Sequence, residues 1–320
     1  VFNEFYGMSF TGANVGTVVG NAGMIVRTTN GGSIWTQQTS GTASSLRGVC
    51  FTDANTGTVV GETGVILRTT NGGATWVNQS SGTTNDLYGI SFASSTTGIV
   101  VGSLGTILRT TNAGATWVAQ SSGATGQLSQ VFLTNASAGI AVGENGLILR
   151  TTNGGTTWTR QSSGTTEYLL GVAFSDINTG VAVGTTGTIL RTTNGGATWT
   201  SESSGTFNKI YGVSYAGNTF NVCGDWELVL RYSAAAPTAD LVKVTSGTFQ
   251  MGSTTGNSDE SPVHSVTLGG FYIDKTEITY EKWTDVRNWG LTNGYTDLSV
   301  GGNGADPHGT NNPVTYVNWY

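Results

Sequence analysis

Charged side chains are scarce in this chain of 320 residues, because Asp, Glu, Lys and Arg together make up 10 % of it, against about 25 % in a typical soluble protein. The net charge is −6 and no large region is basic, which argues against nucleic acid as a partner. The sequence has no run of about 18 apolar residues, so it predicts no transmembrane helix. Proline occurs four times and glycine 49 times. Glycine without proline, mixed with Val, Thr and Trp, predicts many short strands joined by tight turns.

Cysteine is rare as well. Cys50 and Cys223 lie far apart in strand-like runs, and we expect both to be small buried residues. A disulfide between them stays open, because a sequence cannot set their distance. This composition is typical of secreted bacterial proteins, because it has little Cys, Lys and Glu and much Thr, Ser, Asn and Gly. We therefore expect an extracellular, cell-surface or periplasmic location, with no export signal in the sequence as it begins at Val1.

A repeat of about 41 residues runs through most of the chain. The segment from Ile66 to Trp76 recurs letter for letter at 189–199, with close variants at 25–35, 107–117 and 148–158. An arginine occupies the same place in all six copies, and a tryptophan follows it in the first five.

Each copy has the pattern of four short strands. In the second copy the strands are expected at 46–51, 58–61, 65–70 and 75–79, with a hairpin turn at 61–64. Four strands in about 41 residues make one propeller blade, and stacked blades bury the faces that a single sheet leaves exposed. We predict an all-β fold with a six-bladed β-propeller of four-stranded blades. A β-solenoid is the alternative architecture, and seven blades are expected if a repeat has been lost before Val1.

The sixth copy stops after its third strand, at Tyr232. An open propeller would expose two sheet edges, which favours aggregation. We therefore expect residues near Val1 to Phe5 to supply the missing strand of the last blade, or to have continued into it.

The segment from Thr69 to Trp76 resembles the Asp-box, the bacterial neuraminidase (BNR) repeat, with Asn71 in place of its Asp. The longer pattern of Gly-Val-x-Phe, Val-Gly-x-x-Gly, Ile-Leu-Arg-Thr-Thr-Asn-Gly-Gly and Trp resembles the propeller of the photosystem II assembly and stability factor. This resemblance covers about residues 5–232. It implies a propeller whose Asp-box is a structural hairpin, and a client protein bound through an arginine-rich face.

The repeated arginines form a ring at one radius if the propeller is regular. One interpretation is structural, with each arginine bonding carbonyl groups or packing over a Trp between blades. The other is a cationic ring that grips the acidic side chains or the C-terminal carboxylate of a partner protein, and the photosystem-factor resemblance favours it. The candidate binding residues, the arginine ring, are Arg27, Arg68, Arg109, Arg150, Arg191 and Arg231.

A glycosidase would need a carboxylate pair or a Tyr–Glu pair that breaks the repeat symmetry. Glu62 and Glu144 lie in turns that carry other residues in other copies, and Tyr88, Tyr168 and Tyr211 occupy varying first-strand positions. None of them singles out a site, so we predict no catalytic residues, metal or cofactor in the propeller. A sialidase-like hydrolase and a glycan-binding module with exposed Trp pairs stay open as alternatives.

The region after a linker at 233–240 has a different composition. Its motifs at 244–253, 259–268, 271–279 and 311–320 resemble, in order, the start of the formylglycine-generating enzyme, or sulfatase-modifying factor, domain. That resemblance implies an irregular α+β fold similar to C-type lectins.

This second region departs from the family in length. The family domain is much longer, and its catalytic cysteines and most of its metal-binding residues would follow Tyr320. No cysteine follows Cys223, and a cysteine-dependent oxidase needs its thiols. Ca²⁺ is expected only in a complete domain, because Asp259 and Glu260 are too few to hold it. His264 is expected to bond a local carboxylate.

The sequence thus predicts a propeller at 1–232, a linker at 233–240 and a truncated sulfatase-modifying-factor-like domain at 241–320. The predicted function is a non-enzymatic, exported propeller that binds or scaffolds protein. Its expected partner is a protein with acidic or carboxylate groups, or a cell-surface glycan. The alternative enzyme is a formylglycine-generating oxidase, if the full-length domain is present.

Overall fold

A computed structural model of the chain describes residues 4–226, 228–233, 241–244, 247–251, 264–268 and 271–274. The chain divides into two compact units, Val1–Ala234 and Ala235–Tyr320. Within the described residues, no helix has the length and apolar character needed to cross a membrane.

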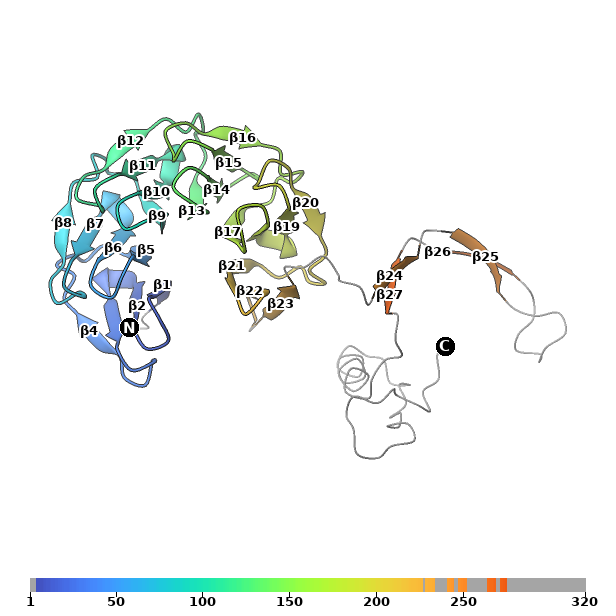
Figure 1. Cartoon of the computed structure of the whole chain (residues 1–320), viewed down its shortest axis with the longest axis horizontal. Helices are drawn as coiled ribbons and strands as arrows, with labels where there is room; N and C mark the ends of the chain where they lie inside the picture. Colours follow the sequence, from blue (N-terminus) through green and yellow to red (C-terminus); the bar gives the residue numbers. More distant parts are fainter. Residues whose placement is uncertain are drawn as a thin grey trace. The chain divides into compact units, whose positions relative to one another are not determined.

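The first unit is an arc of six consecutive β-sheets, each formed by one copy of the repeat, which confirms the predicted propeller architecture (Figure 1). Blade one contains β1 (Phe5–Phe10), β2 (Gly16–Gly20), β3 (Ile25–Thr28) and β4 (Thr36–Gln38); blade two contains β5 (Leu46–Phe51), β6 (Gly57–Gly61), β7 (Ile66–Thr69) and β8 (Val77–Gln79); blade three contains β9 (Leu87–Phe92), β10 (Gly98–Gly102), β11 (Ile107–Thr110) and β12 (Val118–Gln120). Blade four contains β13 (Leu128–Leu133), β14 (Gly139–Gly143), β15 (Ile148–Thr151) and β16 (Thr159–Gln161); blade five contains β17 (Leu169–Phe174), β18 (Gly180–Gly184), β19 (Ile189–Thr192) and β20 (Thr200–Glu202); blade six contains β21 (Ile210–Ala216), β22 (Thr219–Gly224) and β23 (Val229–Ser233). Neighbouring strands are antiparallel and follow chain order from the inner to the outer side of the arc.

Tight turns join the second and third strands of the blades. Four of these connections each contain one short 3₁₀ turn: η1 (Asn21–Gly23), η2 (Glu62–Gly64), η3 (Ser103–Gly105) and η4 (Thr185–Gly187). In η3 both Leu104 (φ 55°) and Gly105 (φ 66°) are left-handed, which is the geometry of a hairpin turn that matches strand twist. The hairpin turn predicted at 61–64 is therefore confirmed.

The turn between the third and fourth strands is held by side chains. In blade two, Thr69 Oγ1 accepts a hydrogen bond from Gly73 N (2.9 Å), and Asn71 Oδ1 accepts one from Thr75 N (3.0 Å). The same pair of bonds recurs in blades three, four and five. The Asn of each copy thus ties its hairpin to its own sheet, which is a structural role.

The hydrophobic core lies between blades and not inside them. Val19 and Ile25 of blade one are fully buried against Leu46, Val49 and Phe51 of blade two. Each of the four later interfaces has its own cluster of this kind. A blade therefore acquires a core only from its neighbours.

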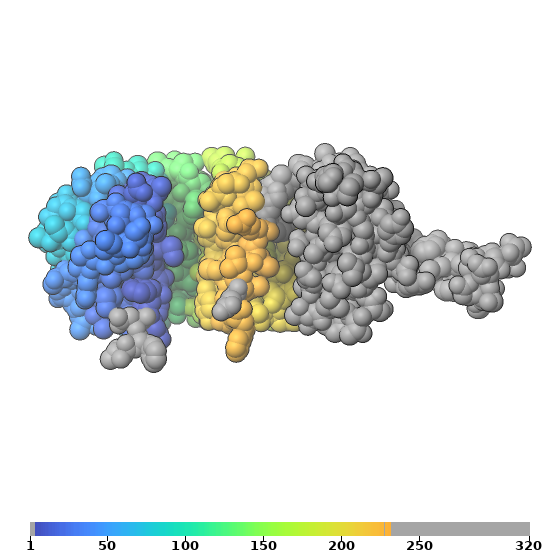
Figure 2. All heavy atoms as spheres, turned by 90° about the horizontal axis from the view of Figure 1, so that it is seen from below, coloured from blue at the N-terminus to red at the C-terminus, as the bar shows by residue number. Residues whose placement is uncertain are grey.

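The two ends of the arc do not meet (Figures 1 and 2). Phe5 pairs with Gly20 of its own blade, so it does not supply a fourth strand to blade six, and residues 1–3 of that prediction lie outside the described residues. Met8 at one end is 70 % exposed, whereas Val49 at the same position of blade two is 8 % exposed. The end faces are apolar because they repeat the sequence of buried interfaces.

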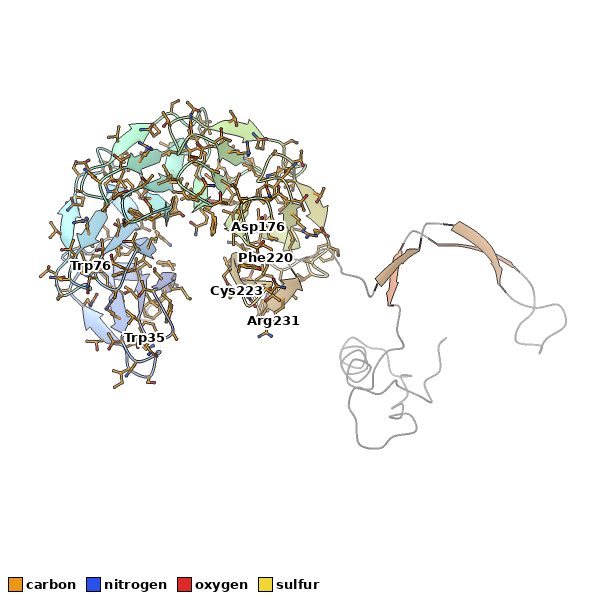
Figure 3. The ribbon with its side chains drawn as sticks, in the orientation of Figure 1. Trp35, Trp76, Asp176, Phe220, Cys223 and Arg231 are labelled. Carbon is orange, nitrogen blue, oxygen red and sulfur yellow. The ribbon has the colours of Figure 1, made fainter. Side chains whose placement is uncertain are left out.

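Both cysteines are free thiols. Cys50 is half-buried, and burial raises the pKa of its thiol. The expectation of burial is wrong for Cys223, which is exposed on β22 of blade six (Figure 3). Its counterpart Val183 in blade five is fully buried, because a following blade covers that face.

The described part of the second unit consists of two strand pairs. β24 (Leu241–Val244) pairs antiparallel with β27 (Phe271–Asp274), and β25 (Gly247–Met251) pairs antiparallel with β26 (His264–Leu268). The carboxylates predicted to be insufficient for Ca²⁺, Asp259 and Glu260, lie outside the described residues.

Gly105 and Gly123 test how tightly the turns are packed, since both have φ +66°. A Cβ on Gly105 would overlap the carbonyl oxygen of Ala124, whereas one on Gly123 would meet no atom within 4 Å. We expect Gly123→Ala to lower the free energy of unfolding by about 1–2 kcal/mol, the cost of left-handed backbone alone, and Gly105→Ala to lower it by about 1–3 kcal/mol more. Urea denaturation followed by circular dichroism measures both. Equal losses would contradict the packing.

Candidate functional site

The arginines of the ring hold neighbouring blades together. In blades two, three and four, the arginine Nε donates a hydrogen bond to a backbone carbonyl in the Asn-Gly-Gly or Asn-Ala-Gly turn of the next blade. The pairs are Arg68 with Ala113 (2.7 Å), Arg109 with Gly154 (2.7 Å) and Arg150 with Gly195 (2.8 Å). The structural interpretation of the ring expects contacts of this kind, in which an arginine bonds a carbonyl group between blades.

Arg27 contacts blade two in a variant of this arrangement. It donates to Thr17 Oγ1 in its own blade (2.8 Å) and to the carbonyl oxygen of Ala54 in blade two (2.5 Å). Its guanidinium also lies 4.8 Å from the centre of the Phe51 ring. Burial lowers the pKa of Arg27.

The last two arginines occupy the same place on blades five and six. Arg191 is half-buried on β19, and Arg231 is exposed on the free end of blade six (Figure 3). The structure therefore brings the ring arginines into one series of equivalent positions along the arc. Their role in binding a partner stays a prediction.

The repeated tryptophans of blades three, four and five pack into the interface with the preceding blade. Trp117, Trp158 and Trp199 are 8–9 % exposed. Trp35 on the end blade is 39 % exposed and packs edge-on against Phe10 (Figure 3). Trp226 of blade six is 88 % exposed, and the glycan-binding alternative stays a prediction.

The repeat varies most clearly on the inner side of the arc, where the first strand of each blade runs (Figure 1). Each first strand has a register shift near its start, which leaves one residue without a partner on the second strand. Such bulges re-aim a side chain. The six bulge residues are Tyr6, Arg47, Tyr88, Ser129, Leu170 and Tyr211.

At blades one and two the bulge residues belong to a polar cluster, the first quartet, formed by Glu4, Tyr6, Arg47 and Glu62. Arg47 forms an ion pair with Glu62, including an Nε–Oε1 hydrogen bond of 3.2 Å. Its guanidinium lies 4.0 Å from the centre of the Tyr6 ring, and the Tyr6 hydroxyl donates to Glu4 (2.6 Å).

The charges of this quartet support one another. The hydrogen bond to Glu4 raises the pKa of Tyr6. Burial opposes the charge of Arg47, but the hydrogen bond and the charge of Glu62 outweigh burial and raise the pKa of Arg47. The cluster therefore keeps a fixed cation between an aromatic ring and a carboxylate.

Blade six carries a related cluster. The Nζ of Lys209 lies 4.6 Å from the centre of the Tyr211 ring. A hydrogen bond with Asp225 raises the pKa of Tyr211. The inner rim thus presents tyrosines flanked by carboxylates, in two places with a cation of the chain itself on the ring.

Sequence reasoning named several of these residues without joining them into a site. Glu62, Tyr88 and Glu144 were informative because they vary in an otherwise constant repeat. The bulge that aims Tyr88 at the rim is set by strand register, which the letters do not display. No group of three or more metal-binding side chains lies together in the part of the chain that the structure describes.

Two family models match the chain. The model described as "Photosynthesis system II assembly factor YCF48" matches residues 1–130 and 76–165, together just over half of the chain. The model described as "Sulfatase-modifying factor enzyme 1-like domain" matches residues 229–320. No curated protein sequence matches the chain.

Solved structures share the propeller fold. "YCF48 bound to D1 peptide" is 20 % identical with a TM-score of 0.50, over 72 % of this chain and 93 % of that one. "YCF48 from Cyanidioschyzon merolae" is 18 % identical with a TM-score of 0.51, over 72 % and 95 %. An ancestral GH74 enzyme is 14 % identical with a TM-score of 0.57, over 85 % of this chain and 38 % of that one. At these identities the likeness shows the fold alone.

Alanine substitutions at Arg109 and Arg231 distinguish the structural role of the ring arginines from the effect of removing a positive charge. We expect Arg109→Ala to lower the free energy of unfolding by about 1.5–3 kcal/mol, because it removes a charged donor from a half-buried carbonyl. Arg231→Ala removes the same charge from an exposed position and should change stability by less than about 0.5 kcal/mol. Thermal and urea unfolding measure both variants. Equal effects would show that the bond to Gly154 does not hold the blades together.

Proposed function

The chain belongs to the photosynthesis system II assembly factor YCF48 family, and from this premise we propose that its propeller is a non-enzymatic platform that binds a segment of a partner protein. The observation that carries the proposal is the YCF48 structure solved with a D1 peptide. A propeller of this family accepts a polypeptide, and the present chain has the same fold.

The regularity of the blades supports a binding role over catalysis. Equivalent positions carry equivalent residues, whereas a catalytic site needs a unique set of side chains in one place. The binding surface we assign first is the arginine ring. In Arg68, Arg109 and Arg150 the Nε is engaged with the next blade, but a guanidinium has five N–H donors. The remaining donors suit a carboxylate of the partner.

The second region is considered separately from the propeller, because it matches a different family. Its match to the sulfatase-modifying factor domain comes without any cysteine after Cys223. We therefore assign no oxidase activity to these residues. Paired cysteines in a longer form of the domain would support the formylglycine-generating alternative. The composition rich in Thr, Ser, Asn and Gly supports export of the whole protein.

The arginine ring is tested with an acidic peptide that carries several glutamates and a free C-terminal carboxylate. We expect the full chain to bind it, and the triple variant Arg68→Ala, Arg109→Ala, Arg150→Ala to bind it about tenfold more weakly, because charge-assisted bonds are lost. Binding should also weaken as salt is raised. Fluorescence anisotropy at a temperature where circular dichroism shows every variant folded gives the affinities.

Arg160 supplies the matched control, because it is an exposed arginine on the outer strand β16 and lies outside the ring. Arg160→Ala should bind as the unaltered chain does. Unchanged binding in the triple variant would refute the ring as the contact surface. Failure of the unaltered chain to bind any peptide of a broad array would refute the protein-binding function itself.

A further inference from the structure

The first quartet has a counterpart two blades further along the chain. Two repeats after Glu4, Tyr6, Arg47 and Glu62 stand Asp86, Tyr88, Ser129 and Glu144. The tyrosine and both carboxylates keep their chemical type in this second quartet. Only the bulge residue that supplies the cation differs, with Ser129 in place of Arg47.

The shared residues make part of the same contacts. The Tyr88 hydroxyl donates to Asp86 Oδ2 (3.4 Å), as the Tyr6 hydroxyl donates to Glu4, and it accepts a hydrogen bond from Ser103 Oγ (3.2 Å). The backbone frame is also the same, because β13 has a bulge at Ser129 as β5 has one at Arg47. The second quartet is therefore built like the first without its cation.

No described arginine or lysine lies over the Tyr88 ring as Arg47 lies over the Tyr6 ring, although the charge of Arg47 reaches Tyr88. Glu144 forms no ion pair with another described residue, in contrast to Glu62 with Arg47. The side chain of Glu144 lies against Gly126 and shares a recess with Arg160. The Ser129 Oγ is buried with no partner in hydrogen-bonding geometry.

A second aromatic ring stands beside the second quartet. Burial raises the pKa of Tyr168, the nearby Ser129 hydroxyl lowers it, and the charges of Tyr88 and Glu144 raise it. Tyr168 is thus within electrostatic reach of all three residues. It is half-buried, as are Tyr88 and Glu144, so one edge of the cluster faces solvent. Two rings and two carboxylates, with no described cation stacked on the Tyr88 ring, form a surface suited to a planar cation.

We propose that the second quartet binds the guanidinium of an arginine side chain from a partner polypeptide, stacked on Tyr88 and paired with Glu144. The guest takes the role that Arg47 has in the first quartet. Arginine fits better than lysine, because a planar guanidinium stacks on a ring and bonds a carboxylate at once. This site deepens the proposed function and rests on it, since the guest is part of a protein.

The test uses the full chain and two peptides, acetyl-Gly-Gly-Arg-Gly-Gly-amide and its citrulline counterpart, which keeps the shape and loses the charge. Saturation-transfer NMR titrations give the affinities. We expect the arginine peptide to bind at least about fivefold more tightly than the citrulline peptide. Ser129→Arg should abolish this preference by filling the site with a cation of the chain itself. Glu144→Gln, which alters no packing, should weaken binding of the arginine peptide to the level of citrulline.

Ser201→Arg is the control, because Ser201 on β20 is exposed and stands one repeat after Arg160, where arginine is already tolerated. It should bind the arginine peptide as the unaltered chain does. Equal binding of both peptides, or equal binding by Ser129→Arg and Ser201→Arg, would overturn the assignment. Binding of the acidic peptide by the same preparations would show that the protein-binding function survives that result.

Discussion

The packing of one blade face against the next is the contact on which the rest of this structure depends. A four-stranded sheet of this size cannot bury both its faces, so Ile25 of one blade needs Leu46 of the next. The same interface is made five times, and the same letters therefore recur at its positions. The arginine bonds between blades reinforce it at the third strand, where Arg68 and its equivalents cross to the neighbouring turn.

This constraint divides the residues of a blade into those that repeat from copy to copy and those that are free to vary. Residues that face a neighbouring blade repeat because every interface has the same shape. Bulge residues on the inner rim are not among the buried core residues of the blade interfaces, so the fold tolerates Tyr, Arg, Ser and Leu there. Because a blade interface needs none of these side chains, their differences are available for binding. A site on this propeller is expected where the repeat varies, and the inner rim is such a place.

The fold could be predicted from the sequence because strands, turns and repeat length are all local signals. The four strands of each copy, the turn at 61–64 and the interrupted sixth copy followed from the repeated Gly, Asn, Trp and β-branched residues. The exposure of Cys223 could not, because it depends on whether another blade covers that face, and periodicity says nothing of what adjoins the last copy. The cluster on the inner rim could not be predicted for a different reason. Strand register, and not composition, brings Tyr88 and Glu144 to one edge of the arc.

The two quartets show how a repeat protein can separate stability from binding. A partly exposed cation on an aromatic ring contributes only about 0.5–1 kcal/mol, so having Ser129 in the second quartet, where the first quartet has Arg47, costs the fold little. Asp86 accepts hydrogen bonds from Thr63 N (2.8 Å) and the Tyr88 hydroxyl (3.4 Å), whereas Glu144 has no ion pair with another described residue. A guest guanidinium on the Tyr88 ring pairs with Glu144 and so supplies the cation that the first quartet takes from Arg47.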